Sequence, residues 1–143
     1  MRWLPAALAI SLTCTACNGP DSDLPPSYRH VAVPAERLRS GEAIARGEAL
    51  YETHCALCHG ERGDGRGRRS AGFAKRPTRF ADPGWRDRTT PRRVFFTIRE
   101  GVSGTPMPSW RWLSEDETWD LAAYVLSLAG TASPGDDASP GSD

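Results

Sequence analysis

The sequence Cys55-Ala56-Leu57-Cys58-His59 lies in the first half of a 143-residue chain. Two cysteines separated by two residues, with a histidine directly after the second, form the pattern of covalent haem attachment. Thiols at this spacing can reach the two vinyl groups of one porphyrin and form thioethers, while the histidine supplies an axial nitrogen to the iron. The pattern predicts one covalent haem c bound by Cys55 and Cys58, with His59 as an iron ligand.

Two other interpretations of this motif remain open. Cys55, Cys58 and His59 could be three ligands of a zinc ion, but a structural zinc site has four ligands and no cysteine lies downstream. A redox-active dithiol of the thioredoxin type requires strands that alternate with helices around the two cysteines, and the sequence shows no such pattern. We therefore favour haem attachment.

The residues around the motif resemble the class I cytochrome c family, which carries one haem. A glycine and an aromatic residue, Gly47 and Tyr51, stand eight and four residues before the first cysteine, as they do in that family. Its second iron ligand is a methionine in a loop before the last helix, and Met107 lies in a matching loop. The resemblance covers roughly residues 41–130. It implies an all-α fold, with three to five helices wrapped around one covalently attached haem.

Met107 is the second iron ligand that the resemblance implies. Once Met1 is removed with an export signal, Met107 is the only methionine of the chain. Pro106 and Pro108 fix φ on both sides of it, and such a stiff loop can hold a weak thioether ligand at little entropic cost. The alternative is an apolar methionine that fills a gap in the core.

Residues 1–16 resemble a bacterial export signal, with Arg2 followed by a mostly apolar stretch and then small residues. The apolar run is too short to span a bilayer as a helix. The sequence Thr15-Ala16-Cys17 resembles the end of a lipoprotein signal, although Cys14 occupies a position usually held by leucine. This predicts a lipidated Cys17 that anchors the protein to a membrane on the periplasmic side. Ordinary cleavage, which leaves a soluble periplasmic protein, is the alternative.

Two further segments differ in composition from the expected domain at 41–130. Prolines and polar residues dominate 17–40, which predicts a flexible and extended tether. Residues 131–143 consist largely of serine, proline, glycine and aspartate, and they predict a disordered tail. A core of roughly ninety residues is marginal, so a buried haem would contribute substantially to it.

Three helices are expected inside the domain. The first runs from about Gly41 to His54 and contains Gly47, which costs about 1 kcal/mol relative to alanine inside a helix. The resemblance implies that this glycine lets a second helix cross at close range. His54 neighbours the motif but is not expected to be a ligand.

The second helix is predicted over 91–100, with Thr90 as its N-cap and Gly101 as its stop. Its apolar face is expected to point toward the haem, and consists of Val94, Phe95 and Ile98. The last helix is predicted over 114–128, where Ser114 and Glu117 form a capping box.

Basic residues are concentrated after the motif, with twelve Arg or Lys against five Asp or Glu between residues 61 and 100. This surplus could steer an acidic redox partner, or it could simply be a solvated face. Arg79 or Arg86 is expected to pair with a haem propionate, with Trp85 as another donor. The resemblance also implies that the carbonyl of Pro77 accepts a hydrogen bond from the ring of His59. Nucleic-acid binding is not expected, because the basic stretch lacks interleaved aromatic residues and the chain carries an export signal.

The resemblance implies an electron-transfer protein and not an enzyme. If His59 and Met107 fill both axial positions, no position is left open for oxygen or peroxide, and this ligand pair raises the reduction potential. We expect a one-electron carrier that exchanges electrons with an oxidase, reductase or dehydrogenase of a respiratory chain. A fixed cytochrome subunit of a larger respiratory oxidase or dehydrogenase complex is the main alternative. A haem peroxidase or sensor is a minor one.

Overall fold

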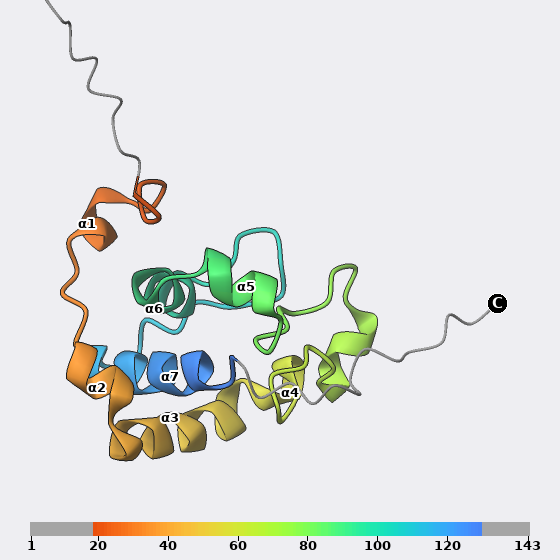
Figure 1. The fold of residues 1–143 in the computed structure, drawn as a ribbon. Helices are drawn as coiled ribbons and strands as arrows, with labels where there is room; N and C mark the ends of the chain where they lie inside the picture. The colour runs from red at the N-terminus through yellow and green to blue at the C-terminus, as the bar shows by residue number, and fades with distance from the viewer. Residues whose placement is uncertain (1–18, 130–143) are drawn as a thin grey trace, which may run out of the picture.

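The computed structural model describes residues 19–129, and all regular secondary structure in this part of the chain is helical (Figure 1). Three helices are long: α3 (Gly41–His54), α6 (Pro91–Glu100) and α7 (Glu115–Ser127). Shorter ones complete the order along the chain, namely α1 (Pro26–Arg29), α2 (Ala35–Arg39), α4 (Ala56–His59), the 3-10 helix η1 (Arg68–Gly72) and α5 (Pro83–Arg88). The predicted all-α class is confirmed. The predicted signal, Cys17 and the predicted tail lie outside the described residues.

The ends of α3 and α6 follow from their capping residues. The Ser40 hydroxyl accepts a hydrogen bond from the backbone N–H of Ala43 at 3.3 Å, so α3 begins where its first free N–H groups are satisfied. Thr90 caps α6 in the same way, through the N–H of Arg93 at 3.1 Å. Helix α6 ends at Gly101, whose φ of 70° favours glycine. The predicted bounds of both helices are confirmed.

Helix α7 begins with the predicted capping box. The Ser114 hydroxyl accepts from the N–H of Glu117 at 3.2 Å, and the Glu117 carboxylate accepts from the N–H of Ser114 at 2.8 Å. The hydroxyl and the backbone N–H of Ser114 both donate to the Glu117 carboxylate and hold its pKa below the usual value. The box also satisfies free N–H groups at the start of the helix. The helix that follows is buried along much of its length and forms the centre of the core. None of the described helices is both long and apolar enough to cross a membrane.

Helices α3 and α7 run side by side and make close backbone contact at Gly47 (Figure 1). A Cβ atom at this position would lie 2.6 Å from the carbonyl carbon of Asp120 and 2.9 Å from the Cβ of Tyr124. One turn further along α3, the ring of Tyr51 packs on that of Tyr124 with a centroid distance of 5.1 Å. The predicted close crossing at Gly47 is therefore confirmed.

Helix α6 covers another side of α7. Phe95 stacks on Trp119 with a centroid distance of 4.3 Å, and Val94 and Ile98 are buried beside it. The ring of Tyr28, from α1, packs against the same helix. The predicted apolar face of α6 therefore packs into the protein core, and its residues are not among those that line the cavity described below.

The N-terminal segment is packed on the domain, so the prediction of a flexible tether is wrong for residues 19–40. Leu24 is only 1% exposed, and the ring of Tyr28 packs edge-on against Phe96 at 4.9 Å. The Tyr28 hydroxyl donates a hydrogen bond to the carboxylate of Glu100. Composition indicated a weakly structured segment, but a few apolar and aromatic side chains find sites on the core, and these contacts order the segment.

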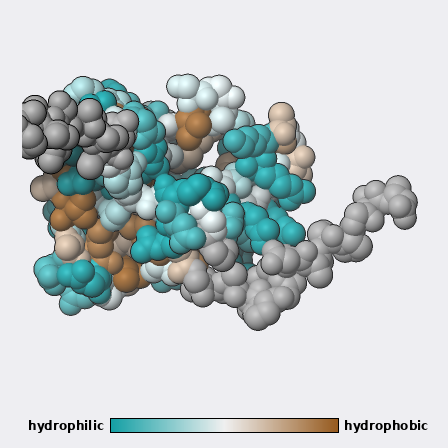
Figure 2. All heavy atoms as spheres, turned by 45° about the horizontal axis from the view of Figure 1, so that its top comes forward, coloured by the Kyte–Doolittle hydropathy of each residue, from teal (hydrophilic) through white to brown (hydrophobic). Residues whose placement is uncertain are grey.

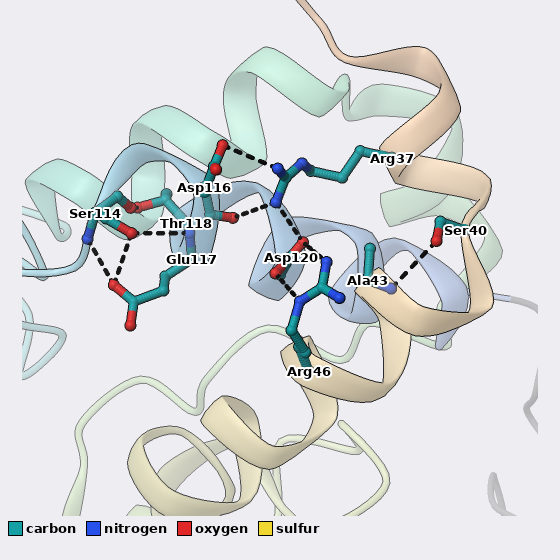
Figure 3. A network of polar contacts seen from close by, with 9 residues as sticks. All are labelled: Arg37, Ser40, Ala43, Arg46, Ser114, Asp116, Glu117, Thr118 and Asp120. Atoms are coloured by element: carbon teal, nitrogen blue, oxygen red, sulfur yellow. Dashed lines mark hydrogen bonds and ion pairs between the residues drawn. The ribbon is translucent and has the colours of Figure 1, made fainter.

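A network of charged side chains joins this segment to α3 and α7 (Figure 3). Arg37 of α2 and Arg46 of α3 donate to the carboxylate of Asp120 on α7, at 2.8 and 2.7 Å. Arg37 also pairs with Asp116 at 3.0 Å. The Asp120 side chain is only 5% exposed. Its burial would be costly without these partners.

Arg37→Ala is expected to lower the free energy of unfolding by about 1–2 kcal/mol, because it removes charge-assisted hydrogen bonds from a buried carboxylate that Arg46 still partners. Arg39→Ala is the matched control, since Arg39 lies in the same helix and pairs only with the exposed Glu36. Exposed pairs of this kind contribute about 0–1 kcal/mol. Chemical denaturation of both variants measures the difference, and equal midpoints would contradict the role given to Arg37.

Candidate haem site

The Cys-x-x-Cys-His motif forms one turn of helix directly after α3. The backbone N–H groups of Cys58 and His59 both donate to the carbonyl of Cys55, at 3.0 and 2.8 Å. Residues three and four apart on a helix share a face, so this turn brings both thiols and the imidazole to the same side. Neither cysteine is paired in a disulfide. Burial, followed by the influence of Cys58, raises the pKa of Cys55 to about 12.

A cavity of about 500 Å³ opens beside this turn, within the range of about 300–1,000 Å³ that is usual for ligand sites. Three segments contribute its lining: the end of α3 with the motif, part of 69–78, and part of 102–110. Cys55, Cys58, His59 and Met107 all line it. The structure thus brings together the four residues that the sequence singled out, although Met107 lies far from the motif along the chain.

His59 is oriented by an aromatic residue that the sequence did not reveal. The ring of Phe80 stacks on the imidazole with a centroid distance of 4.8 Å and an interplanar angle of 16°. The N–H of Phe80 in turn donates to the carbonyl of Gly63 at 2.8 Å, which fixes Phe80 against the loop after the motif. Burial lowers the pKa of His59, while the backbone of Thr78 acts in the opposite direction. The lowered pKa favours the neutral imidazole, which is the form that binds a metal.

The ring nitrogen Nδ1 of His59 is buried and has no hydrogen-bond partner among the described residues. The expected acceptor, the carbonyl of Pro77, instead packs against Gly65, where a Cβ atom would lie 2.6 Å from it. The hydrogen bond that the resemblance implied is therefore not formed in this structure.

The glycine-rich loop after the motif folds back onto it. The N–H groups of Gly65 and Gly67 donate to the carbonyls of His59 and Cys58, at 2.8 and 3.2 Å. A Cβ atom at Gly67 would lie 2.5 Å from the carbonyl carbon of Cys58, so only glycine permits this approach. These contacts hold the motif against the loop.

Met107 is held by the backbone of its own loop. Its N–H donates to the Thr105 hydroxyl at 3.2 Å, and its carbonyl accepts from the N–H of Val102 at 3.2 Å. The loop closes on Gly101, where a Cβ atom would lie 2.6 Å from the Met107 carbonyl. Because Pro106 restricts the preceding φ as well, the backbone of Met107 is held firmly at the cavity.

Three cationic side chains line the cavity, but they are not the ones expected. Arg69, Lys75 and Arg76 contribute to its wall, whereas Arg79, Arg86 and Trp85 do not. Trp85 packs on the ring of Phe80 instead, with a centroid distance of 5.1 Å. The general surplus of basic residues was visible in the sequence. Which of them reach the cavity depends on the path of the loop.

The mouth of the cavity also carries an aromatic cluster. His54 lines the cavity, and its ring lies 5.2 Å from the rings of Trp110 and of Trp112. Trp112 is 63% exposed. His54 was not expected to be a ligand, and as the last residue of α3 it packs against the tryptophans that follow Met107.

The residues of the cavity fit haem c. Two thiols can form thioether bonds, an imidazole and a thioether are the nitrogen and sulfur donors that iron accepts, and cationic side chains suit the carboxylates of the porphyrin. Within residues 19–129, no group of three or more His, Cys, Asp or Glu side chains is placed to hold a metal ion. The zinc interpretation finds no support in that part of the chain.

Residues 42–125 match the model of the family described as cytochrome c oxidase, cbb3-type, subunit III. The chain belongs to this family. It is a c-type cytochrome, and its cofactor is covalent haem c.

The cytochrome also resembles individual proteins. It is 36% identical to the cbb3-type cytochrome c oxidase subunit CcoP of Rubrivivax gelatinosus, over 76% of this chain and 34% of that protein. It is 32% identical to the cytochrome bc1 complex cytochrome c subunit of Corynebacterium diphtheriae, over 64% of this chain and 30% of the relative. The chain thus spans about a third of the length of these curated relatives. Among solved structures, a chain of the reducing HAO-like protein complex of Kuenenia stuttgartiensis superimposes with a TM-score of 0.56 at 30% identity, covering 63% of this chain and 45% of the other.

Proposed function

We propose that this cytochrome carries one electron at a time between redox proteins of a respiratory chain, on the periplasmic side of a membrane. The observation that supports this most directly is the convergence of two thiols, one imidazole and one thioether on a single cavity. When bound there, haem c supplies reversible one-electron chemistry. The protein supplies attachment, axial ligation and burial.

We assign the roles of the cavity residues as follows. Cys55 and Cys58 would hold the porphyrin through thioether bonds. His59, kept neutral by burial and oriented by Phe80, and Met107 would supply the two protein ligands of its iron. With both ligands in place, no position would be open to oxygen or peroxide, so we infer a site for electron transfer and not for catalysis.

The partner that suits this site is a redox protein with an acidic surface near its own cofactor. Arg69, Lys75 and Arg76 lie at the cavity, and positive charge around a redox centre speeds the approach of an acidic partner. This attraction should weaken as salt concentration rises, because the Debye length shortens.

A fixed subunit of a larger respiratory complex is the second candidate. It is favoured by the two curated relatives described above, both of which are named as subunits of respiratory complexes. Purification in mild detergent separates the candidates: a stoichiometric partner that stays bound supports the subunit, and a protein that purifies alone supports the carrier.

Membrane attachment is proposed to occur through lipidation of Cys17, which lies outside the described residues. More than one acyl chain gives stable anchoring, whereas a single chain gives only marginal binding. Intact mass and membrane fractionation of Cys17→Ser test this step. A variant that remains in the membrane fraction would contradict it.

The double variant Cys55→Ser/Cys58→Ser is expected to lose covalent haem completely, because a hydroxyl does not form the thioether bond. Haem staining of a denaturing gel measures this directly, since only covalently attached haem survives denaturation. Cys17→Ser is the reciprocal control: it should still stain for haem but should no longer appear in the membrane fraction. If the double variant retained covalent haem, the assignment of the motif would be wrong.

A further inference from the structure

The first part of the described chain is held on the domain by a continuous set of contacts. We call residues 20–39 the strap. Near its start, the guanidinium of Arg93 pairs with Asp23 and donates to the carbonyl of Pro20 at 2.9 Å. The guanidinium of Arg92 donates to the carbonyl of Val31 at 2.8 Å. The strap is thus fixed to α6 from its first residue.

The far end of the strap is fixed to the opposite side of the core. Arg37 reaches Asp116 and Asp120 on α7, and Figure 3 shows its side chain extending from α2 to that carboxylate pair. Between the two ends, Leu24 is buried at 1% exposure. A segment held at both ends and in between follows the domain as a rigid part of it.

The distance from the proposed lipid anchor to the strap is short. Only two residues lie between Cys17 and Pro20, and the three Cα–Cα steps that join them span at most about 11 Å at about 3.8 Å each. A free tether over 17–40 would instead reach some tens of ångströms at roughly 3 Å per residue. An acyl chain on Cys17 therefore keeps the start of the strap close to the membrane.

We propose that the strap, with the start of α6, is the surface that faces the phospholipid bilayer, so that the anchored cytochrome is held close to the membrane in one orientation. This inference rests on the proposed lipidation of Cys17. The lipid headgroup layer occupies this surface. The short link from Cys17 leaves no room for another protein between the surface and the bilayer.

The chemistry of the strap suits this position. Residues 19–40 contain three Asp or Glu and three Arg, and all six side chains make hydrogen bonds or ion pairs within the described protein. The segment is therefore neutral and its charges are already partnered, which limits the cost of desolvation at a lipid surface. Figure 2 shows hydrophobic residues at the left of the view, among hydrophilic ones. The exposed large hydrophobic side chains, Leu57, Val102 and Trp112, lie outside the strap.

The orientation leaves the haem cavity accessible. None of residues 19–40 lines the cavity, and Figure 1 shows α1 and α2 at one end of the molecule and α4 with its loop at the other. The cavity is thus presented away from the bilayer contact, to a partner fixed in the same membrane. With the strap docked, the haem domain cannot swing away from its anchor. It can therefore exchange electrons only with redox partners that lie next to it in the membrane.

The test places a nitroxide label at each end of the full-length acylated holo-protein. Ser27→Cys labels the strap and Glu61→Cys labels the loop after the motif, both at exposed positions. The protein is bound to vesicles of phosphatidylethanolamine and phosphatidylglycerol that include a lipid with a nickel-chelating headgroup. We expect nickel to relax the strap label several-fold more strongly than the loop label. Equal relaxation, or stronger relaxation at position 61, would overturn the proposal.

Two controls separate this inference from the lipidation on which it rests. Asp21→Asn/Asp23→Asn removes only the strap carboxylates that pair with α6 and leaves the core unchanged. It should reduce the difference in nickel-induced relaxation between the two labels. An unchanged difference would overturn the docked strap. Intact mass reports the acyl chains. A protein without them overturns both proposals, whereas an acylated protein with equal relaxation at both labels overturns only the orientation.

Discussion

Gly47→Val is expected to abolish the accumulation of folded holo-protein. The first side-chain carbon would overlap the backbone of Asp120 on α7, and it would also lie 2.9 Å from the Cβ of Tyr124. No rotamer of the valine relieves an overlap made by its Cβ, so α3 and α7 have to separate. Overpacking costs about 1–3 kcal/mol where side chains can adjust. Here the obstacle is backbone, so the loss should reach about 3 kcal/mol or more, a large part of the usual 5–15 kcal/mol.

The control for this variant is Gly41→Val at the start of the same helix. A Cβ atom at Gly41 would meet nothing within 4 Å, so the variant carries the same change in helix propensity without the overlap. Haem-stained yield and thermal melting of the soluble domain measure both. Normal yield and melting of Gly47→Val would show that the two helices do not need their close approach.

The long helices could be predicted from the sequence because their ends are encoded locally. Thr90, Pro91 and Gly101 mark both ends of α6 within a dozen residues, and each acts through its own backbone geometry or a hydrogen bond to a neighbouring residue. The attachment motif is equally local, since one turn of helix is enough to bring its thiols and imidazole to one side. Met107 was singled out by the resemblance to class I cytochrome c, and because it is the only methionine once Met1 is removed.

The strap could not be predicted, because its structure depends on partners far along the chain. Asp23 and Pro20 are fixed by Arg93, at sequence separations of 70 and 73. The prolines indicated correctly that the segment forms no long helix. They carried no information about the sites that α6 and α7 offer to Leu24 and Arg37.

The cationic wall of the cavity and the ring behind His59 were missed for a related reason. Twelve basic residues lie between 61 and 100, and no local pattern shows which three of them a loop without regular periodicity turns inward. Phe80 reaches His59 because its backbone is tied to Gly63. A hydrogen bond between two parts of a loop has no characteristic spacing in the sequence, so this contact could not be predicted from it.

Met107→Ala is expected to change the ligation of the iron while leaving the haem attached. It removes the thioether from the cavity, so the weak near-infrared band of sulfur-to-iron ligation should disappear and a high-spin or ligand-open spectrum should replace it. The reduction potential should fall by on the order of 0.1 V, a fraction of the about 0.8 V that axial ligands span. Covalent attachment should persist, because Cys55 and Cys58 are unchanged.

Val102→Ala provides the matched control, because Val102 lines the same cavity and loses apolar volume without losing a donor atom. It should retain the near-infrared band and a potential close to that of the parent. Pro106→Ala tests the stiffness of the loop: it keeps the thioether but frees φ before it, so the band should remain and become more easily lost on mild heating. An unchanged spectrum of Met107→Ala would show that the sulfur does not ligate the iron, and the role of the loop would then be limited to closing the cavity.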